Sequence, residues 1–160
     1  ALRQAGVKQP LALPAVALPP TTLGQLGEAA EGLLVASNFR PAGAGGEANT
    51  QFEQEMSEFS PGARRNMFSR QSWLAARTLA VAIAQSPDLA AGGTIDAATV
   101  LALMGRLDAL PMGAMTPPLT TTTALSPPYS RLFSRQVLYG RVKSGAIELL
   151  NDQWHPVVLD

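Results

Sequence analysis

The sequence predicts an α/β protein with β-strands near both ends of the chain and helices between them. Three observations lead to this prediction: short apolar runs bounded by Pro and Gly near the N-terminus, three segments of helical spacing in the middle, and alternating apolar residues near the C-terminus. Of the 160 residues, 46% are hydrophobic and 15% are charged. A chain of this composition can bury a core, so we expect an ordered protein.

Two short strands are expected in the first forty residues. Residues 11–13 are apolar, and Pro14 is expected to end the strand because proline cannot donate to a sheet ladder. A weak, glycine-interrupted helical turn is expected over residues 23–29, and residues 33–36 are expected to form a buried strand. This order of strand, helical turn and strand is typical of α/β architecture.

Three helices are expected in succession after the Pro/Gly loop at residues 41–46. The first is amphipathic, with Phe52, Met56 and Phe59 on one face. The second covers residues 67–85 and is apolar almost all round, so it should be largely buried; Ser86-Pro87 should stop it. The third should start near Thr94 or Ile95, with Asp96 in its first turn and apolar residues at 100, 103, 104 and 107.

The C-terminal segment should return to β-structure. Val137, Tyr139 and Val142 recur around turn signals at Ser144-Gly145 and Asn151-Asp152. We expect two short antiparallel strands followed by an extended terminal piece.

Charge and composition argue against nucleic acid binding, cysteine chemistry and a membrane span. Twelve basic and twelve acidic residues give a net charge of zero, so no nucleic acid partner is expected. The absence of cysteine excludes disulfides and thiolate chemistry. The most apolar window, "WLAARTLAVAIA", contains Arg77 and is shorter than the roughly 20 residues of a membrane span, so it predicts a buried helix.

No catalytic residue, metal site or cofactor is expected. His155, the only histidine, lies close to Asp152, but no nucleophile accompanies the two, so we interpret this region as a surface turn. Glu28 and Glu31 could be the carboxylate pair of a hydrolase, but a solvated helix face and a strand entry explain them better.

The remaining candidates for chemistry also have simpler interpretations. One histidine with scattered carboxylates does not provide metal-ligand spacing. The glycines of residues 43–46 lack the lysine of a phosphate-binding loop. The glutamates of the first long helix are interpreted as its solvated face: Glu47, Glu53, Glu55 and Glu58.

Phe68 and Trp73 give the one signal of interest for binding. They are five residues apart at the start of the second long helix and so lie on different faces. One can join the core while the other borders the helix N-terminus, where free N–H groups can meet the anionic end of a ligand. The alternative, that both aromatic residues are core residues, remains open.

Several stretches together resemble a known family. They are, in order, "LGEAAEGLLVASNF", a Gly-rich loop with a Phe-bearing acidic helix, "FSRQSWLAARTLAVAIAQS", a helix that starts Thr-Ile-Asp-Ala, and "LYGRVKSGAIELLNDQWHPV". Over nearly all of the chain they resemble the C-terminal half of the branched-chain amino-acid-binding family, the type 1 periplasmic-binding-protein receptors of ABC importers. The resemblance implies a fold of two Rossmann-like lobes, of which this chain supplies only the C-terminal portion.

The resemblance also implies a domain organisation. Residues 1–39 would end the second lobe, residues 40–126 would complete the first lobe with three helices, and residues 127–160 would cross back to the second lobe. The chain would cross between lobes near residues 38–40 and 124–128. Its opening, "ALRQAG", would be the end of a helix, so the chain is expected to be a fragment that follows a longer N-terminal part.

The function implied by the resemblance is binding, without catalysis. The complete receptor would hold a small molecule in the cleft between lobes and pass it to an ABC permease, in the periplasm or outside the cell. A lipid anchor could lie on the absent N-terminal part, and no signal-peptide pattern opens this chain. A ligand-sensing regulatory domain of the same fold is the alternative, and a small α/β enzyme is a third. The chain should associate with the absent segment or with itself.

By the same resemblance, Ala15, Val16 and Phe68 would form part of the ligand-binding wall. Family members that select α-amino acids place an acidic residue just after the strand that corresponds to residues 11–13. Residues 14–17 of this chain read Pro-Ala-Val-Ala and carry no charge. We therefore expect an aromatic or aliphatic carboxylate or an amide, with an amino acid as the alternative if the absent half supplies the acidic group.

Overall fold

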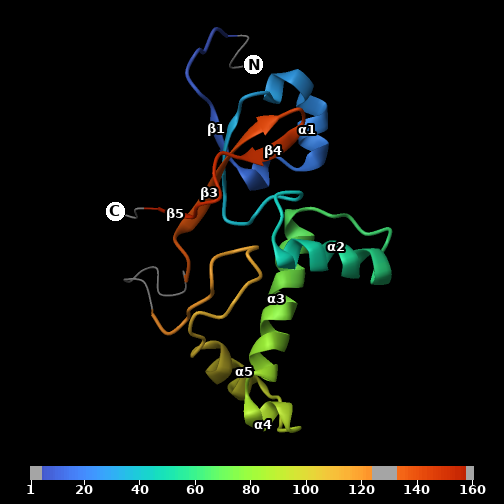
Figure 1. Cartoon of the computed structure of the whole chain (residues 1–160), viewed down its shortest axis with the longest axis vertical. Helices are drawn as coiled ribbons and strands as arrows, with labels where there is room; N and C mark the ends of the chain where they lie inside the picture. Colours follow the sequence, from blue (N-terminus) through green and yellow to red (C-terminus); the bar gives the residue numbers. More distant parts are fainter. Residues whose placement is uncertain (1–4, 124–132, 158–160) are drawn as a thin grey trace.

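The computed structural model describes residues 5–123 and 133–157 of the chain. Its elements are β1 (Ala12–Pro14), η1 (Ala15–Ala17), α1 (Pro20–Leu26), η2 (Gly27–Ala30), β2 (Leu34–Ser37), α2 (Glu47–Phe59), α3 (Met67–Ala84), α4 (Pro87–Ala90), α5 (Ala97–Met104), β3 (Gln136–Lys143), β4 (Ala146–Leu149) and β5 (His155–Pro156). Figure 1 shows the strands and the short N-terminal helices at one end of the molecule and α3 to α5 at the other.

The sheet joins strands from the two ends of the chain. Its strand order is β1-β2-β3-β4, with β5 paired to the start of β3. β1 and β2 are parallel, and β3 runs antiparallel to β2, with Val35 opposite Gly140. β3 and β4 form a hairpin whose turn residues, Ser144 and Gly145, have φ angles of 50° and 78°. Two positive φ angles in a two-residue turn match the twist of the flanking strands.

An apolar cluster lies between this sheet and the short helices beside it. We call strands β1 to β5 with η1, α1 and η2 the sheet unit. The buried members of its cluster are Ala15, Leu18, Leu23, Ala30, Leu33, Val35 and Val142.

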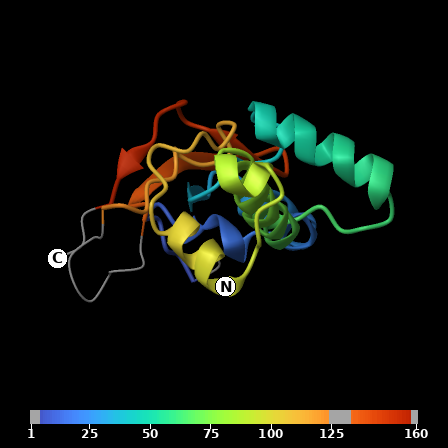
Figure 2. The same cartoon turned by 90° about the horizontal axis from the view of Figure 1, so that it is seen from below.

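The rest of the described chain, α2 to α5 with the loops of residues 39–123, is here called the helical unit. Its buried residues form two clusters, one around Phe52 and Met115 and one around Leu103 and Leu110. Figure 2 shows α2 extending to one side of α3. At the start of α3, the Asn66 side chain accepts a hydrogen bond from the backbone N–H of Ser69 at 3.1 Å, and Ser69 Oγ accepts one from the Asn66 N–H at 2.9 Å. This capping box fixes where the helix begins.

Most elements expected from the sequence are present, and the α/β fold class is confirmed. The third helix differs from expectation at both ends. Asp96 is its N-cap, accepting a hydrogen bond from the Thr99 N–H at 2.7 Å, and does not lie within the first turn. The helix ends at Met104 with Gly105 as its C-cap, so Leu107 lies beyond it, although Leu107 is still buried. The short elements η1 and α4 were not predicted.

Two expectations concern residues outside the described ranges. They are the helical ending of residues 1–4 and the crossing near residues 124–128. The lobe boundaries stay a prediction. No helix within the described ranges has both the length and the apolar character needed to cross a membrane.

Candidate functional site

The segment that follows β1 lies beside the N-terminal end of α3. Met67, the first residue of α3, packs against the sheet-unit cluster that contains Ala15 of η1. Figure 1 shows the start of α3 next to this end of the sheet unit. The parallel strands β1 and β2 both end here, at Pro14 and Ser37. In open α/β sheets, ligands bind outside the carboxyl ends of parallel strands, which makes this the candidate site.

The three residues predicted to contact ligand are placed differently from one another. Ala15 is 7% exposed and belongs to the core of the sheet unit, so its side chain offers little surface. Val16 is 47% exposed, and Phe68, the second residue of α3, is 64% exposed. Val16 of η1 and Phe68 of α3 thus present apolar surface, and ligand contact by all three residues stays a prediction.

Trp73 lies on the core side of α3, unlike Phe68. Its ring meets that of Phe52 edge to face, and its indole Nε1 donates a hydrogen bond to Glu55 Oε2 at 2.6 Å. Of the two aromatic residues at the start of α3, Phe68 alone is free to face a ligand.

A buried arginine that the sequence analysis did not single out fixes the first turns of α3 against α2. The Arg70 guanidinium donates to Asn49 Oδ1 and to Glu53 Oε1, each at 2.6 Å, and lies over the Phe52 ring. Burial lowers the pKa of Arg70, and the neighbouring Glu53 carboxylate opposes this shift. The Glu53 carboxylate stabilises the charged guanidinium, and the pair holds the start of α3 against α2.

The α2 glutamates are therefore not all the solvated face that the sequence predicted. Glu53 bridges Arg70 and Arg65, and Glu55 accepts hydrogen bonds from Trp73 and Gln51. The hydrogen bond from Trp73 is the main reason that the pKa of Glu55 is lowered. A spacing of residues along one helix does not reveal that a second helix supplies donors to these carboxylates.

Asp152, His155 and Glu31, which were also considered for chemistry, each have a structural partner. Asp152 pairs with Arg40, while His155 Nε2 lies 3.2 Å from Asn151 Oδ1. Glu31 accepts a hydrogen bond from the Ser144 N–H at 3.0 Å, which joins η2 to the β3-β4 turn. Over residues 5–123 and 133–157, no group of three or more His, Asp or Glu side chains is placed to hold a metal ion.

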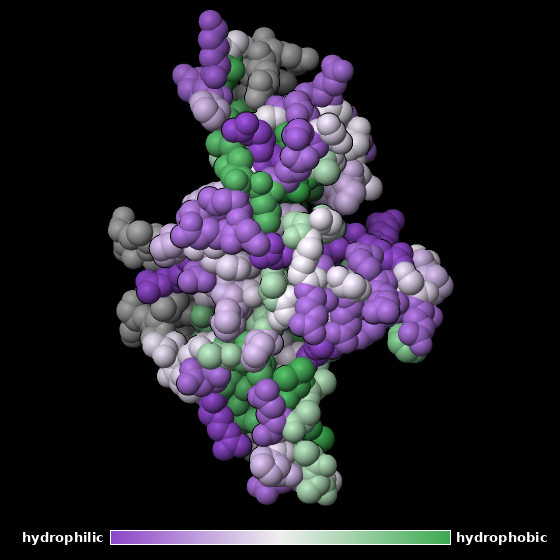
Figure 3. Space-filling view, in the orientation of Figure 1, coloured by the Kyte–Doolittle hydropathy of each residue, from purple (hydrophilic) through white to green (hydrophobic). Residues whose placement is uncertain are grey.

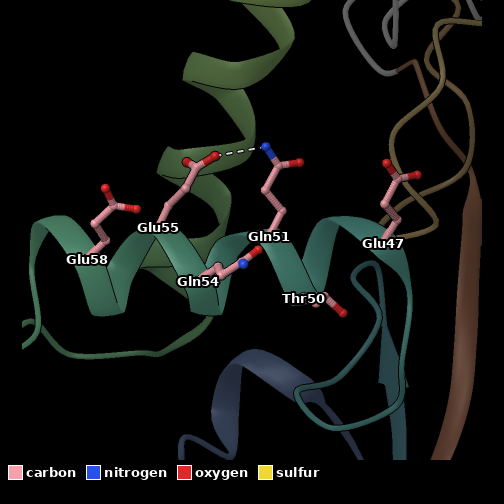
Figure 4. Close-up of a pocket in the computed structure, with 6 residues that line it drawn as sticks. All are labelled: Glu47, Thr50, Gln51, Gln54, Glu55 and Glu58. Atoms are coloured by element: carbon pink, nitrogen blue, oxygen red, sulfur yellow. Dashed lines mark hydrogen bonds between the residues drawn. The ribbon is translucent and has the colours of Figure 1, made fainter.

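Two grooves lie elsewhere on the surface, along α2. The larger groove, of about 620 Å³, is lined by α2 alone and is shown in Figure 4. The smaller, of about 210 Å³, lies between α2, α3 and the loop at residues 111–113. Both are open and rich in polar side chains, whereas small-molecule sites enclose most of their ligand among apolar groups. The larger groove is lined by Glu47, Thr50, Gln51, Gln54, Glu55 and Glu58.

Comparison with protein families gives one match. The family model described as "Periplasmic binding protein" matches residues 1–137. Among curated proteins, none matches the sequence significantly.

Several solved structures share the fold. A possible leucine/isoleucine/valine-binding protein from Rhodopirellula baltica is 16% identical, with a TM-score of 0.67 over 94% of this chain and 38% of its own. A branched-chain amino acid ABC transporter protein from Thermus thermophilus with bound valine is 14% identical, with a TM-score of 0.67 over 98% of this chain and 41% of its own.

A third similar structure is a fatty acid ABC transporter substrate-binding protein from Thermomonospora curvata. It is 16% identical, with a TM-score of 0.68 over 98% of this chain and 39% of its own. This chain thus spans about two-fifths of the length of the solved structures that it matches.

Proposed function

Because the chain belongs to the periplasmic binding protein family, we propose that it is part of a receptor that binds a small solute and delivers it to an ABC permease. The observation that carries the proposal is the family match over residues 1–137. One similar solved structure is named as a fatty acid ABC transporter substrate-binding protein, and another as a branched-chain amino acid ABC transporter with bound valine. A location in the periplasm or outside the cell is part of the same proposal.

The solute-binding surface in this proposal lies where η1 meets the start of α3. Val16 and Phe68 provide exposed apolar surface, and Ala15 lies in the core of the sheet unit. The backbone N–H groups in the first turn of α3 favour an anionic group on the ligand. An apolar wall beside a helix N-terminus suits a ligand with a hydrocarbon part and a carboxylate.

The ligand in this proposal lacks a free α-ammonium group. The segment that leaves β1, residues 14–17, carries no acidic side chain. Burying an ammonium group without a partner costs at least several kcal/mol, on the order of the penalty for an unpaired polar group or more. Of the similar structures, one holds valine and another is named for fatty acids, so the shared fold accommodates both classes. An aromatic or aliphatic carboxylate or an amide fits this chain's residues better than an amino acid.

Calorimetric titration of the complete receptor tests the ligand class. Leucine, isoleucine and valine are compared with carboxylates of the same side chains that lack the amine. We expect binding of the carboxylates and weaker binding of the amino acids. Micromolar binding of the amino acids with none of the deaminated analogues would overturn the proposed ligand class.

The receptor in this proposal also needs more structure than this chain provides. Within the described residues β1 pairs only with β2, and all three of its residues are exposed. Figure 3 shows apolar surface over β1 and again over α3 to α5, where Leu101 and Ile95 are exposed. The absent part of the receptor, or a second copy of this chain, covers these surfaces.

A further inference from the structure

One ion pair connects the sheet unit to the helical unit. Arg40 Nη2 lies 2.5 Å from Asp152 Oδ1. Arg40 follows β2 at the point where the chain enters the helical unit, and Asp152 lies between β4 and β5. The two residues are 112 positions apart in the sequence, so the pair exists only because the fold brings them together.

The arginine is a fixed part of the helical unit. Its Nε donates to the Ala114 carbonyl at 2.9 Å and its Nη1 to the Ala44 carbonyl at 3.3 Å, while its backbone N–H donates to the Met115 carbonyl at 2.8 Å. The side chain is only 8% exposed. The guanidinium is therefore anchored by two loops of the helical unit, and one of its nitrogens is directed at the sheet unit.

The aspartate is the more exposed partner. Its side chain is 71% exposed, and it lies on a connecting segment between two short strands. The exposed carboxylate can be solvated by water when it leaves the arginine, whereas the buried guanidinium stays bonded to the carbonyl groups of the helical unit. The pair thus has one fixed member and one member that can be released.

Within the described part of the chain, the other ion pairs do not link the two units. Three join α2 to α3 or to the loop before it, and one lies across the β3-β4 hairpin. They are Glu53 with Arg65, Glu53 with Arg70, Glu55 with Arg77, and Lys143 with Glu148.

The short connection beside the pair is itself restrained. The Ser37 hydroxyl donates to the Phe39 carbonyl at 2.5 Å and accepts from the Phe39 N–H, so the chain turns tightly between β2 and Arg40. A tight connection limits the movement to a rotation about this point. Asp152 provides a polar contact on the returning segment, in addition to the apolar contact of Met67 with the sheet-unit cluster, and this polar contact can set the angle of that rotation.

We propose that Arg40 and Asp152 form a clamp that fixes the orientation of the sheet unit on the helical unit. The clamp is closed in this structure and opens when the Asp152 carboxylate leaves the guanidinium. This proposal concerns the geometry of the chain itself and stands whether or not a solute binds at the candidate site.

Distance measurements between spin labels test the clamp. The chain has no cysteine, so Gln54→Cys on α2 and Ala146→Cys on β4, both exposed, place one label on each unit. The labelled chain is compared with the same chain carrying Asp152→Asn, which removes the charge, and Asp152→Glu, which keeps it. Glu148→Gln is the matched control, because it breaks the exposed pair with Lys143 inside the hairpin.

We expect Asp152→Asn to broaden the distance distribution and shift its mean by several ångströms. Asp152→Glu should restore most of the original distribution, and Glu148→Gln should leave it unchanged. Equal distributions for the parent chain and Asp152→Asn would overturn the proposal, as would an equal change in Glu148→Gln.

A second measurement applies if Asp152→Asn loses its circular dichroism signal. The labelled parent chain is then measured at low salt and at about 1 M salt, where the Debye length falls to about 3 Å. A broader distribution at high salt supports the clamp, because Asp152 is exposed to the ions. An unchanged distribution overturns it.

Discussion

Phe52 of α2 and Trp73 of α3 meet edge to face, with ring centroids 5.7 Å apart and ring planes inclined at 78°. This contact lies at the centre of the cluster that holds the two longest helices together. Arg70 lies over the other part of the Phe52 ring, 5.0 Å from its centroid. The start of α3 is thereby held by Phe52 of α2, whose side chain is fully buried.

Replacing Phe52 by alanine should destabilise the protein strongly. The side chain is fully buried, and removing a buried phenylalanine leaves a cavity and costs about 3 to 5 kcal/mol. The matched control is Phe59→Ala on the same helix, where the ring is exposed and the change should stay within about 0.5 kcal/mol. Urea unfolding of both variants measures the difference, and similar losses would show that α2 does not pack as described.

Stability should depend on pH through Glu55. The hydrogen bond from Trp73 holds the pKa of Glu55 below its ordinary range in the folded protein. The ionised carboxylate therefore stabilises the fold at pH values above the ordinary glutamate pKa of about 4.3, and this contribution is lost as the pH falls through the lower folded pKa. The difference in unfolding free energy between the parent chain and Glu55→Gln should shrink over this acidic range. A difference that stays constant from neutral pH into that range would contradict the assignment.

Replacing Phe68 by alanine should weaken ligand binding without changing stability. The ring is exposed in the free chain, so the fold does not depend on it, but a ligand that covers it gains apolar burial. Loss of that burial corresponds to about a tenfold or larger rise in the dissociation constant. Calorimetry on the complete receptor measures the effect, with Phe59→Ala as the control. Equal affinities for the two variants would remove Phe68 from the binding surface.

The isolated chain should self-associate. β1 presents an unpaired edge and exposed apolar side chains, including Leu13, within the described residues. Light scattering should give a mass above that of one chain, and Leu13→Lys should lower it because a charge at the edge opposes pairing. Gln71→Lys, on an exposed position of α3, adds the same charge away from the edge and serves as the control. A clean monomer with cooperative unfolding would show that β1 needs no further partner.

The family and the order of elements could be predicted from the sequence because both depend on local patterns. Phe52 and Met56 mark the packed face of α2, although Phe59, expected on the same face, is exposed. Ser144-Gly145 marks the hairpin turn. The family resemblance in the stretches around α1 to α3 is confirmed by the match over residues 1–137.

The contacts that shape the candidate site could not be predicted in this way. Arg70 looks like an ordinary surface residue of a helix, and only the position of α2 makes it a buried partner of Asn49 and Glu53. The pairing of Arg40 with Asp152 likewise depends on the return of the chain to the sheet. The start of α5 was expected at Thr94 or Ile95, two or three residues before Ala97, because an acidic residue such as Asp96 favours both the N-cap and the first turn.

The place of β3 in the sheet sets the order in which the protein can assemble during synthesis. β2 needs residues 138–141 as its antiparallel partner, yet these leave the ribosome only after all the helices have been made. The clusters of the helical unit close within residues 39–119, so that unit can form early, whereas β1 and β2 must wait as an unfinished pair. Such distant pairing slows folding. A chain cut before Gln136 would therefore lose the middle of its sheet and the Asp152 side of the clamp together, while keeping its helices.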